Sequence, residues 1–366
     1  MPIASWRAYQ QITEIRTRNL RFSTQETSQY LEGILGREVS EEAAAWTTKT
    51  EGWIVALQLA ALSLQERPQM TGWEDVVPSQ NRFLHEYLLD EVLTRLPQNQ
   101  YDSLLRTAIL DSFCADLYEA CRLDSHDDKS PGMTGEQFIE WLKQSNLFLI
   151  SLDRENEWFR YHHLFRDYLV RMQEKRWTRQ EINTLHLKAS RWFAENGLVN
   201  RAIRHALMAD DPQTALDIFK ANRLAAMNRE DWRQLEQWVS LFPEEVIQNS
   251  PILLLTTAHL PLTYGYELGP LLMQVGQLLA GLPSDSPDLP NLWAELSYFS
   301  GLNALMEGPA EAAIDTGKTM LATLPQDAYY LRIQALGVEA FGYQMSGNIQ
   351  KGVEIFKERK GQAIGR

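Results

Sequence analysis

The chain has 366 residues, of which 44% are hydrophobic, and this predicts roughly two or three domains with well-filled cores. Its net charge of −13 argues against a protein whose main role is to coat nucleic acid, because phosphate contacts require clustered lysine and arginine. Two cysteines are too few for a disulfide framework or a zinc site, and no apolar stretch has the length of a signal peptide or a membrane span, so we expect a cytoplasmic protein without a membrane segment.

The first part of the chain is expected to be helical. Residues 1–18 are too short to form a domain, whereas residues 19–78 carry helix signals. Ser23 is followed three residues later by Glu26, which is the spacing of a capping box at a helix start. Apolar residues then recur at helical spacing until a polar connector begins at Pro68. We therefore predict a helical domain over residues 19–78.

Residues 79–175 have the pattern of a winged-helix domain. Helices are predicted at about 83–95, 99–110, 115–122, 135–145 and 163–172, with one short β-hairpin at about 147–161. The tip of this hairpin carries Asp153, Glu155 and Glu157, and acidic side chains are poor contacts for a phosphate backbone. Direct DNA binding through the wing is therefore the weaker hypothesis for this domain.

From about residue 176 the sequence becomes repetitive. Three predicted helix ends finish with an apolar residue and a proline, at Pro243, Pro283 and Pro325, spaced 40 and 42 residues apart. Periods of this length are typical of a solenoid of helical hairpins related to tetratricopeptide repeats. We predict an incomplete TPR-like helical-repeat solenoid over residues 176–366. Without a capping helix, its last hairpin around Val353 and Phe356 is expected to promote self-association.

The most informative stretch is an aromatic strand that runs into paired histidines at a helix start, from Trp158 to Leu169. A histidine at a helix N-terminus can bind an anion together with the free backbone N–H groups there. The alternative is that the aromatic residues and the two histidines, His162 and His163, pack the wing against the helix. From this local pattern alone, both interpretations stay open.

The wider sequence contains a set of segments whose order and spacing are specific. They are Asn19 to Ser23, Thr50 to Leu64, Tyr87 to Leu93, Leu105 to Leu110, Ser145 to Phe148, Tyr161 to Phe165 and Ala202 to Leu207. Over about residues 7–210 this set closely resembles the middle region of MalT-like, ATP-dependent LuxR-type transcriptional regulators. These proteins belong to the signal-transducing (STAND) ATPases, which share a nucleotide-binding, helical and winged-helix core. The resemblance implies that residues 1–18 are the remnant of a nucleotide-binding domain.

The resemblance also implies where a nucleotide would be contacted, with ATP or ADP as the cofactor of such a regulator, whereas this chain alone is expected to hold no cofactor. His162 matches a histidine that touches the β-phosphate of bound ADP, with Tyr161 and His163 as departures beside it. Gly52-Trp53-Ile54 matches a Gly-x-Pro sequence whose proline contacts adenine, so Trp53 and Ile54 become candidates although Ile54 replaces the proline. Arg21 is a further candidate at the edge of the helical domain, with an ordinary surface arginine as the alternative.

Two hallmarks of the resembled family are missing from this sequence. No Gly-x-x-x-x-Gly-Lys-Ser/Thr loop occurs, because Gly317-Lys318-Thr319 has Ala312 at the position of the first glycine and lies in a helical run. No C-terminal DNA-binding helix-turn-helix is present either. We therefore expect no ATP hydrolysis by this chain, no catalytic residues, and no sequence-specific DNA binding. The histidines also lack a carboxylate or thiol partner at metal-ligand spacing, so no metal site is predicted.

The leading hypothesis is a central signal-sensing and coupling region of a MalT-like regulator. A small-molecule inducer or a protein segment would bind the solenoid and change the nucleotide state and self-association. The solenoid segment 243–325 has nine acidic residues against Lys318 alone, which would repel DNA. The alternative is a stand-alone TPR-like scaffold that binds a protein partner and has no nucleotide role.

Overall fold

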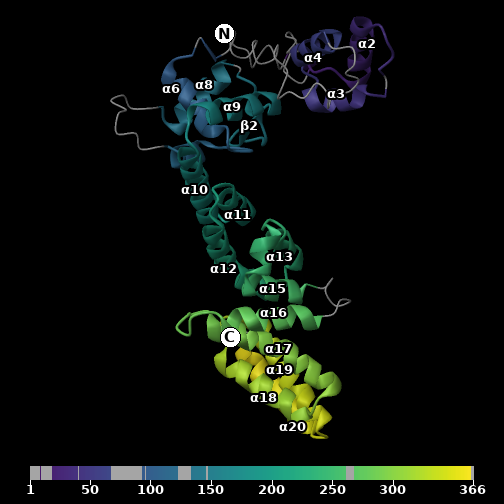
Figure 1. The fold of residues 1–366 in the computed structure, drawn as a ribbon, viewed down its shortest axis with the longest axis vertical. Helices are drawn as coiled ribbons and strands as arrows, with labels where there is room; N and C mark the ends of the chain where they lie inside the picture. The colour runs from purple at the N-terminus through teal and green to yellow at the C-terminus, as the bar shows by residue number, and fades with distance from the viewer. Residues whose placement is uncertain are drawn as a thin grey trace. The chain divides into compact units, whose positions relative to one another are not determined.

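The computed structural model of the protein describes residues 9, 19–39, 41–66, 93–94, 96–122, 133–145, 147–260 and 268–363 (Figure 1). The predicted nucleotide-binding remnant other than Tyr9, the connector that begins at Pro68, and most of the predicted helix at 83–95 lie outside these residues. Two compact units divide the chain, Met1–Leu185 and His186–Arg366. The predicted fold class is confirmed, because the described residues are mainly helical with one short antiparallel hairpin. The finer domain boundaries remain predictions.

Three helices form the first part of the amino-terminal unit: α2 (Thr24–Leu35), α3 (Ala43–Thr50) and α4 (Ile54–Glu66), drawn in purple in Figure 1. The predicted capping box is present at the start of α2. The backbone N–H of Ser23 donates to the Glu26 carboxylate at 2.8 Å, and the Glu26 N–H donates to the Ser23 hydroxyl. All three helices contact one another around the buried side chains of Leu31, Trp46 and Leu57. This small core fixes the turn between α3 and α4, which forms part of the site described below.

The winged-helix part follows, with its hairpin between the third and fourth described helices. Its elements are α6 (Gln98–Thr107), α7 (Ala115–Ala120), α8 (Gly135–Ser145), β1 (Leu149–Ser151), β2 (Phe159–Tyr161) and α9 (His163–Arg176). In the hairpin, Ile150 pairs with Arg160 in an antiparallel register. Phe113 adds a single bridge to Phe159, a third strand contact that the sequence pattern did not reveal.

The core of the winged helix holds β2 against α6 and α9. The buried hydroxyl of Tyr161 lies 2.7 Å from the Thr107 hydroxyl, and burial raises the pKa of this tyrosine. Side-chain amide Nε2 of Gln173 donates to the Leu105 carbonyl at 2.8 Å, which satisfies a polar group that would otherwise be buried without a partner. The end of β2, and with it the start of α9, is therefore fixed in place by buried contacts.

The carboxyl-terminal unit is a stack of helical hairpins, as predicted. After α10 (Arg179–Glu195), which contains the boundary between the units, come α11 (Val199–Met208), α12 (Pro212–Asn228), α13 (Trp232–Val239), α14 (Glu244–Gln248), α15 (Pro251–His259), α16 (Leu268–Ala280), α17 (Leu289–Glu307), α18 (Ala310–Thr323), α19 (Tyr329–Met345) and α20 (Ile349–Ala363). Helices α13, α16 and α18 end just before the prolines that defined the repeat. Successive helices α17 to α20 pack side by side in Figure 1. Among the described residues, no helix is both long and apolar enough to cross a bilayer.

The Gly317-Lys318-Thr319 sequence lies inside α18, as its helical context predicted. A Cβ atom on Gly317 would meet the Ala335 carbonyl oxygen of α19 at 2.7 Å, so the missing side chain lets the two helices approach closely. The Lys318 ammonium lies over the Tyr343 ring at 5.7 Å from its centroid. This glycine and lysine therefore serve helix packing in the solenoid.

Candidate functional site

A cavity of about 650 Å³ in the amino-terminal unit is lined by all four residues that the resemblance singled out. These residues are Arg21, Trp53, Ile54 and His162. One wall comes from the chain before α2 and from the turn between α3 and α4. The other wall comes from the end of α8, the hairpin and the start of α9. Residues far apart in the sequence thus meet at one place.

The turn between α3 and α4 depends on Gly52. Helix α3 ends at Thr50, and the next two residues are left-handed, with φ of 50° at Glu51 and 69° at Gly52. A Cβ atom on Gly52 would lie 2.5 Å from the Phe22 carbonyl oxygen, while the Phe22 N–H donates to the Gly52 carbonyl at 2.9 Å. Only glycine permits both the positive φ and this close backbone approach. The turn thereby holds Trp53 beside the chain that carries Arg21.

His162 caps the start of α9 and is almost fully buried, with 5% of its surface exposed. Its Nδ1 accepts from the Leu164 N–H at 3.3 Å, and its Nε2 lies 2.9 Å from the Thr50 carbonyl oxygen. Because a carbonyl oxygen can only accept, we assign the ring proton to Nε2. Burial lowers the pKa of His162 to about 4, so the imidazole is neutral near pH 7.

The capping role changes what His162 offers to an anion. The sequence pattern suggested that the histidine and the free N–H groups of α9 would bind an anion together. In the structure, the Leu164 N–H is instead used by Nδ1 of His162. A ligand phosphate at this ring would therefore have to exchange with one of two hydrogen bonds within the protein, and the phosphate contact stays a prediction.

The two aromatic residues from the two walls face each other across the cavity edge. The Trp53 ring lies edge-on to Phe148, with centroids 4.8 Å apart, and edge-on to His162, with centroids 5.6 Å apart. Ile54 begins α4 and lines the same cavity. Arg21 is 36% exposed and its Nη1 lies 3.4 Å from the Glu51 carboxylate, so it is tied into the site and is not an isolated surface side chain.

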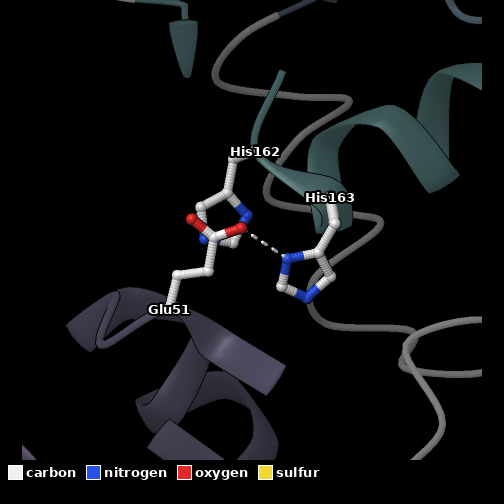
Figure 2. A group of neighbouring side chains, drawn as sticks. All are labelled: Glu51, His162 and His163. Carbon is white, nitrogen blue, oxygen red and sulfur yellow. Dashed lines mark hydrogen bonds and ion pairs between the residues drawn. The ribbon is translucent and has the colours of Figure 1, made fainter. Parts of the chain in front are cut away.

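Glu51 is the residue that sequence reasoning missed. Arg160 donates to both of its carboxylate oxygens, at 2.9 and 3.1 Å. Nδ1 of His163 lies 3.0 Å from Oε1 of the same carboxylate, the contact dashed in Figure 2. Burial alone would raise the pKa of this carboxyl, but the hydrogen bonds from Arg160 and His163 outweigh it and hold the pKa at about 2. One signal was available: a glutamate directly before a glycine at a helix end, where glycine or asparagine is usual.

Glu51, His162 and His163 bring three potential metal-ligand atoms within 4.8 Å of one another (Figure 2). Glu51 and His163 are 112 residues apart in the sequence, so the pattern around the histidines did not point to this carboxylate. However, Glu51 is already bound by Arg160, and both ring nitrogens of His162 are engaged. A cation here would have to displace a guanidinium and two hydrogen bonds, so the contacts favour an ion-pair cluster over a metal site.

A smaller cavity of about 140 Å³ in the carboxyl-terminal unit is lined by residues of α12, α15, α17 and α19 and of the segments just before α17 and α19. Among the lining residues is a buried ion pair, in which the Arg223 guanidinium donates to both carboxylate oxygens of Glu295. Nε of Arg223 also donates to the Thr256 hydroxyl at 2.6 Å. Nε2 of His259 lies 3.1 Å from the same carboxylate. Burial raises the pKa of Glu295, but Arg223 outweighs this effect and holds it at about 2.

Comparison with known proteins supports the resemblance. Residues 89–181 match the family described as the MalT winged helix domain, and this range contains α6, α7, α8, β1, β2, α9 and the first residues of α10. This segment is therefore similar to the MalT winged helix domain. The resemblance of the chain to MalT-like regulators is confirmed by this match together with the relatives that follow.

Curated relatives include the serine/threonine-protein kinase PknK from two strains of Mycobacterium tuberculosis and from Mycobacterium bovis. Each is 33% identical to this chain over 220 residues, which is 60% of the chain but only 19% of the relative. The chain thus spans about a fifth of the length of these relatives. Among solved structures, a signal transduction ATPase with numerous domains (STAND) protein with a tetratricopeptide repeat sensor, from Pyrococcus horikoshii, is 13% identical and covers 94% of this chain and 50% of that chain. The TM-score of this match is 0.48.

Proposed function

We propose that this chain is the signal-sensing and coupling region of a MalT-like, ATP-dependent LuxR-type transcriptional regulator. Nucleotide state would be sensed at the cavity around His162, and the solenoid would bind the inducing signal. The observation that carries this proposal is the convergence of Arg21, Trp53, Ile54 and His162 on one cavity. These four residues were candidates from the sequence alone, so their meeting at one cavity is an independent observation.

The cavity has the chemistry that a nucleotide requires. Its volume of about 650 Å³ falls in the usual range of roughly 300–1,000 Å³ for small-molecule sites. Trp53 and Phe148 offer aromatic surface for a planar base. Lys143 lines the cavity and supplies a cation, and Arg21 and Arg160 leave the neighbourhood of Glu51 with an excess of positive charge. Lys143 and His162 are the residues proposed to face phosphate oxygens.

We further propose that this chain does not hydrolyse ATP by itself. Phosphoryl transfer in such ATPases depends on a P-loop that cradles the phosphates and on an acidic metal ligand. The sequence contains no P-loop, and Gly317-Lys318-Thr319 is used in the packing of α18 on α19. A nucleotide would therefore act on this chain as a bound signal. The protein itself is proposed to be cytoplasmic, as the resembled regulators are.

The solenoid is proposed to take a small molecule or a protein segment, because stacked helical hairpins commonly form such binding surfaces. Self-association is proposed as the output, through the last hairpin around Val353 and Phe356. Val353 and its neighbour Ile349 are exposed, and the side chain of Phe356 lies outside the described residues. Sequence-specific DNA binding by this chain is not expected, since the wing tip and the 243–325 segment are acidic.

The decisive experiment is an ADP titration of the full chain by isothermal calorimetry. We expect measurable binding that Lys143→Ala weakens roughly tenfold, because losing a hydrogen bond to a charged group costs about 1.5 kcal/mol or more. Lys318→Ala is the matched control. Lys143 lies over the Phe159 ring and Lys318 over the Tyr343 ring, but Lys318 belongs to α18 in the solenoid. Absence of ADP binding, or equal loss in both variants, would favour the stand-alone TPR-like scaffold.

A further inference from the structure

Glu51 is an unfavourable residue at the end of α3 for two reasons, its backbone conformation and its charge. A left-handed residue after a helix is usually glycine or asparagine, because a side chain costs roughly 1–2 kcal/mol in this conformation. A carboxylate at a helix C-terminus also faces the negative end of the helix dipole. Glu51 nevertheless adopts φ of 50° directly after α3. Such conflicts persist where the side chain is needed for contacts elsewhere.

Those contacts join three elements. The carboxylate of Glu51 holds Arg160 of β2 in a two-point pair, His163 at the first turn of α9, and Arg21 before α2. Its side chain is only 15% exposed, so these ion pairs are less screened than surface pairs.

The same turn also holds the imidazole of His162. The residue before Glu51, Thr50, supplies the carbonyl that accepts from His162 Nε2, and the residue after Gly52, Trp53, packs its ring against that imidazole. A shift of the turn would therefore move the hydrogen-bond acceptor and the aromatic neighbour of His162 together. Side-chain contacts of Glu51 with Arg160 and His163 prevent that shift.

We propose that Glu51 is a positioning residue that locks the α3–α4 turn onto the β2–α9 junction and thereby fixes His162 at the cavity wall. This inference deepens the proposed function, because it assigns a residue that holds the proposed nucleotide-sensing histidine in place. It does not require nucleotide to be present. A ligand that competes for Arg21 or Arg160 would release the lock and free His162.

The test is histidine-ring NMR on the nucleotide-free full chain, with ¹⁵N-labelled histidine and assignment through His162→Gln. In the unmodified chain, His162 should show a protonated Nε2, an unprotonated Nδ1 and a slowly exchanging ring proton. Glu51→Gln should mix the two tautomers and speed exchange of that proton at least tenfold. Glu42→Gln is the matched control, since Glu42 also forms a two-point pair with an arginine, Arg37, next to the same helix.

Two further measurements keep the inference falsifiable. If Glu51→Gln disturbs folding, Arg160→Gln tests the same lock from the other side, and the double variant should change the His162 signals no more than the stronger single variant. Additive changes, or a His162 spectrum equal to that of Glu42→Gln, would overturn the positioning role. A normal His162 response without ADP binding would overturn only the proposed function, so the two failures are distinguishable.

Discussion

The two units of this chain each contain a glutamate held ionised by arginine, but the two surroundings differ. Glu51, in the amino-terminal unit, is partly exposed and has Arg21, Arg160 and His163 as partners. Glu295, in the solenoid, is 2% exposed and depends on Arg223, with His259 beside it. The pKa of each carboxyl is held at about 2. The two carboxyl groups therefore have the same pKa for different reasons: Glu51 belongs to a cluster with three partners, whereas Glu295 belongs to a buried pair with Arg223.

This difference separates two roles for an ion pair. A buried pair is costly to assemble and costlier to break, because removing one partner leaves an uncompensated charge. Arg223 and Glu295 are therefore expected to fix the solenoid in one arrangement. In a cluster with several partners the carboxylate stays paired when one contact is exchanged, so the loss of one partner costs less than in a single buried pair. The cluster at Glu51 is thus suited to rearrangement at a ligand-binding cavity.

The largest effect is expected from Arg223→Met. Glu295 would keep only His259 beside it, so the free energy of unfolding of the carboxyl-terminal unit should fall by about 3–5 kcal/mol. Urea-induced unfolding, followed by hydrogen exchange of peptides from His186–Arg366, measures this loss. Lys220→Ala is the control, because its pair with Asp288 is exposed and 3.4 Å long, and it should cost less than about 1 kcal/mol.

A second variant sharpens this prediction. Replacing both partners, with Arg223→Met and Glu295→Leu together, removes the buried charges and should recover much of the lost stability. If the double variant is as unstable as Arg223→Met alone, packing around the pair matters more than its charge. A single-variant loss below about 1 kcal/mol would remove the contrast between the two units.

Gly52→Ala comes next in size. The new Cβ would strain the left-handed backbone and meet the Phe22 carbonyl at 2.5 Å, so we expect the amino-terminal unit to lose about 2–4 kcal/mol. Gly36→Ala isolates the clash, because Gly36 has φ of 66° but open space around it. Equal losses in thermal unfolding of the two variants would mean that backbone strain alone explains the glycine at position 52.

Much of the fold could be predicted from the sequence because it follows from local signals. The Ser23–Glu26 capping box, the hairpin and the prolines that end solenoid helices were all visible as short patterns. The candidate residues of the site came from the family resemblance, and the structure places them around one cavity. Their predicted roles toward a nucleotide remain to be tested.

The remaining features depend on contacts between distant segments. Arg160 and Glu51 are 109 residues apart in the sequence, and Arg223 and Glu295 are 72 residues apart. No local sequence pattern therefore predicts either pair. The capping role of His162 was also missed, because it requires the tautomer that the Thr50 carbonyl selects from 112 residues away. Such side-chain pairs are set by tertiary packing, which neither periodicity nor capping signals encode.

Acid pH should distinguish the two units through His162. The pKa of this buried imidazole is about 4 in the folded chain and near 6.5 when unfolded, so the unfolded chain binds the proton first. The stability of the amino-terminal unit is therefore highest above pH 6.5 and falls as the pH drops toward 4, by up to about 3 kcal/mol. Glu51 and Glu295 add their losses only below about pH 4.5, where the unfolded carboxyl begins to bind a proton.

Urea-induced unfolding at pH 7.5, 6 and 5, with and without His162→Gln, measures the contribution of His162. The difference between the two chains should shrink as the pH falls, since the glutamine has no proton to bind. The same comparison for peptides from the carboxyl-terminal unit should show no effect of the substitution. A pH-independent difference in the amino-terminal unit would mean that the pKa of His162 is the same in the folded and the unfolded chain.

The smallest effect is expected from His163→Gln, and it tests whether the Glu51 cluster tolerates the loss of one partner. Nδ1 of His163 lies 3.0 Å from Glu51, but this side chain is 34% exposed and the pair carries a full charge only when the imidazole is protonated. Arg160 keeps both carboxylate oxygens bound after the substitution, so the free energy of unfolding should change by less than about 1 kcal/mol. Double-mutant cycles with Arg160→Gln should show the substitution costing more once the guanidinium is gone, because His163 then becomes a main partner of the carboxylate. If His163→Gln alone costs as much as Arg223→Met, the cluster is as dependent on single contacts as the buried pair, and the proposed division of roles between the two units fails.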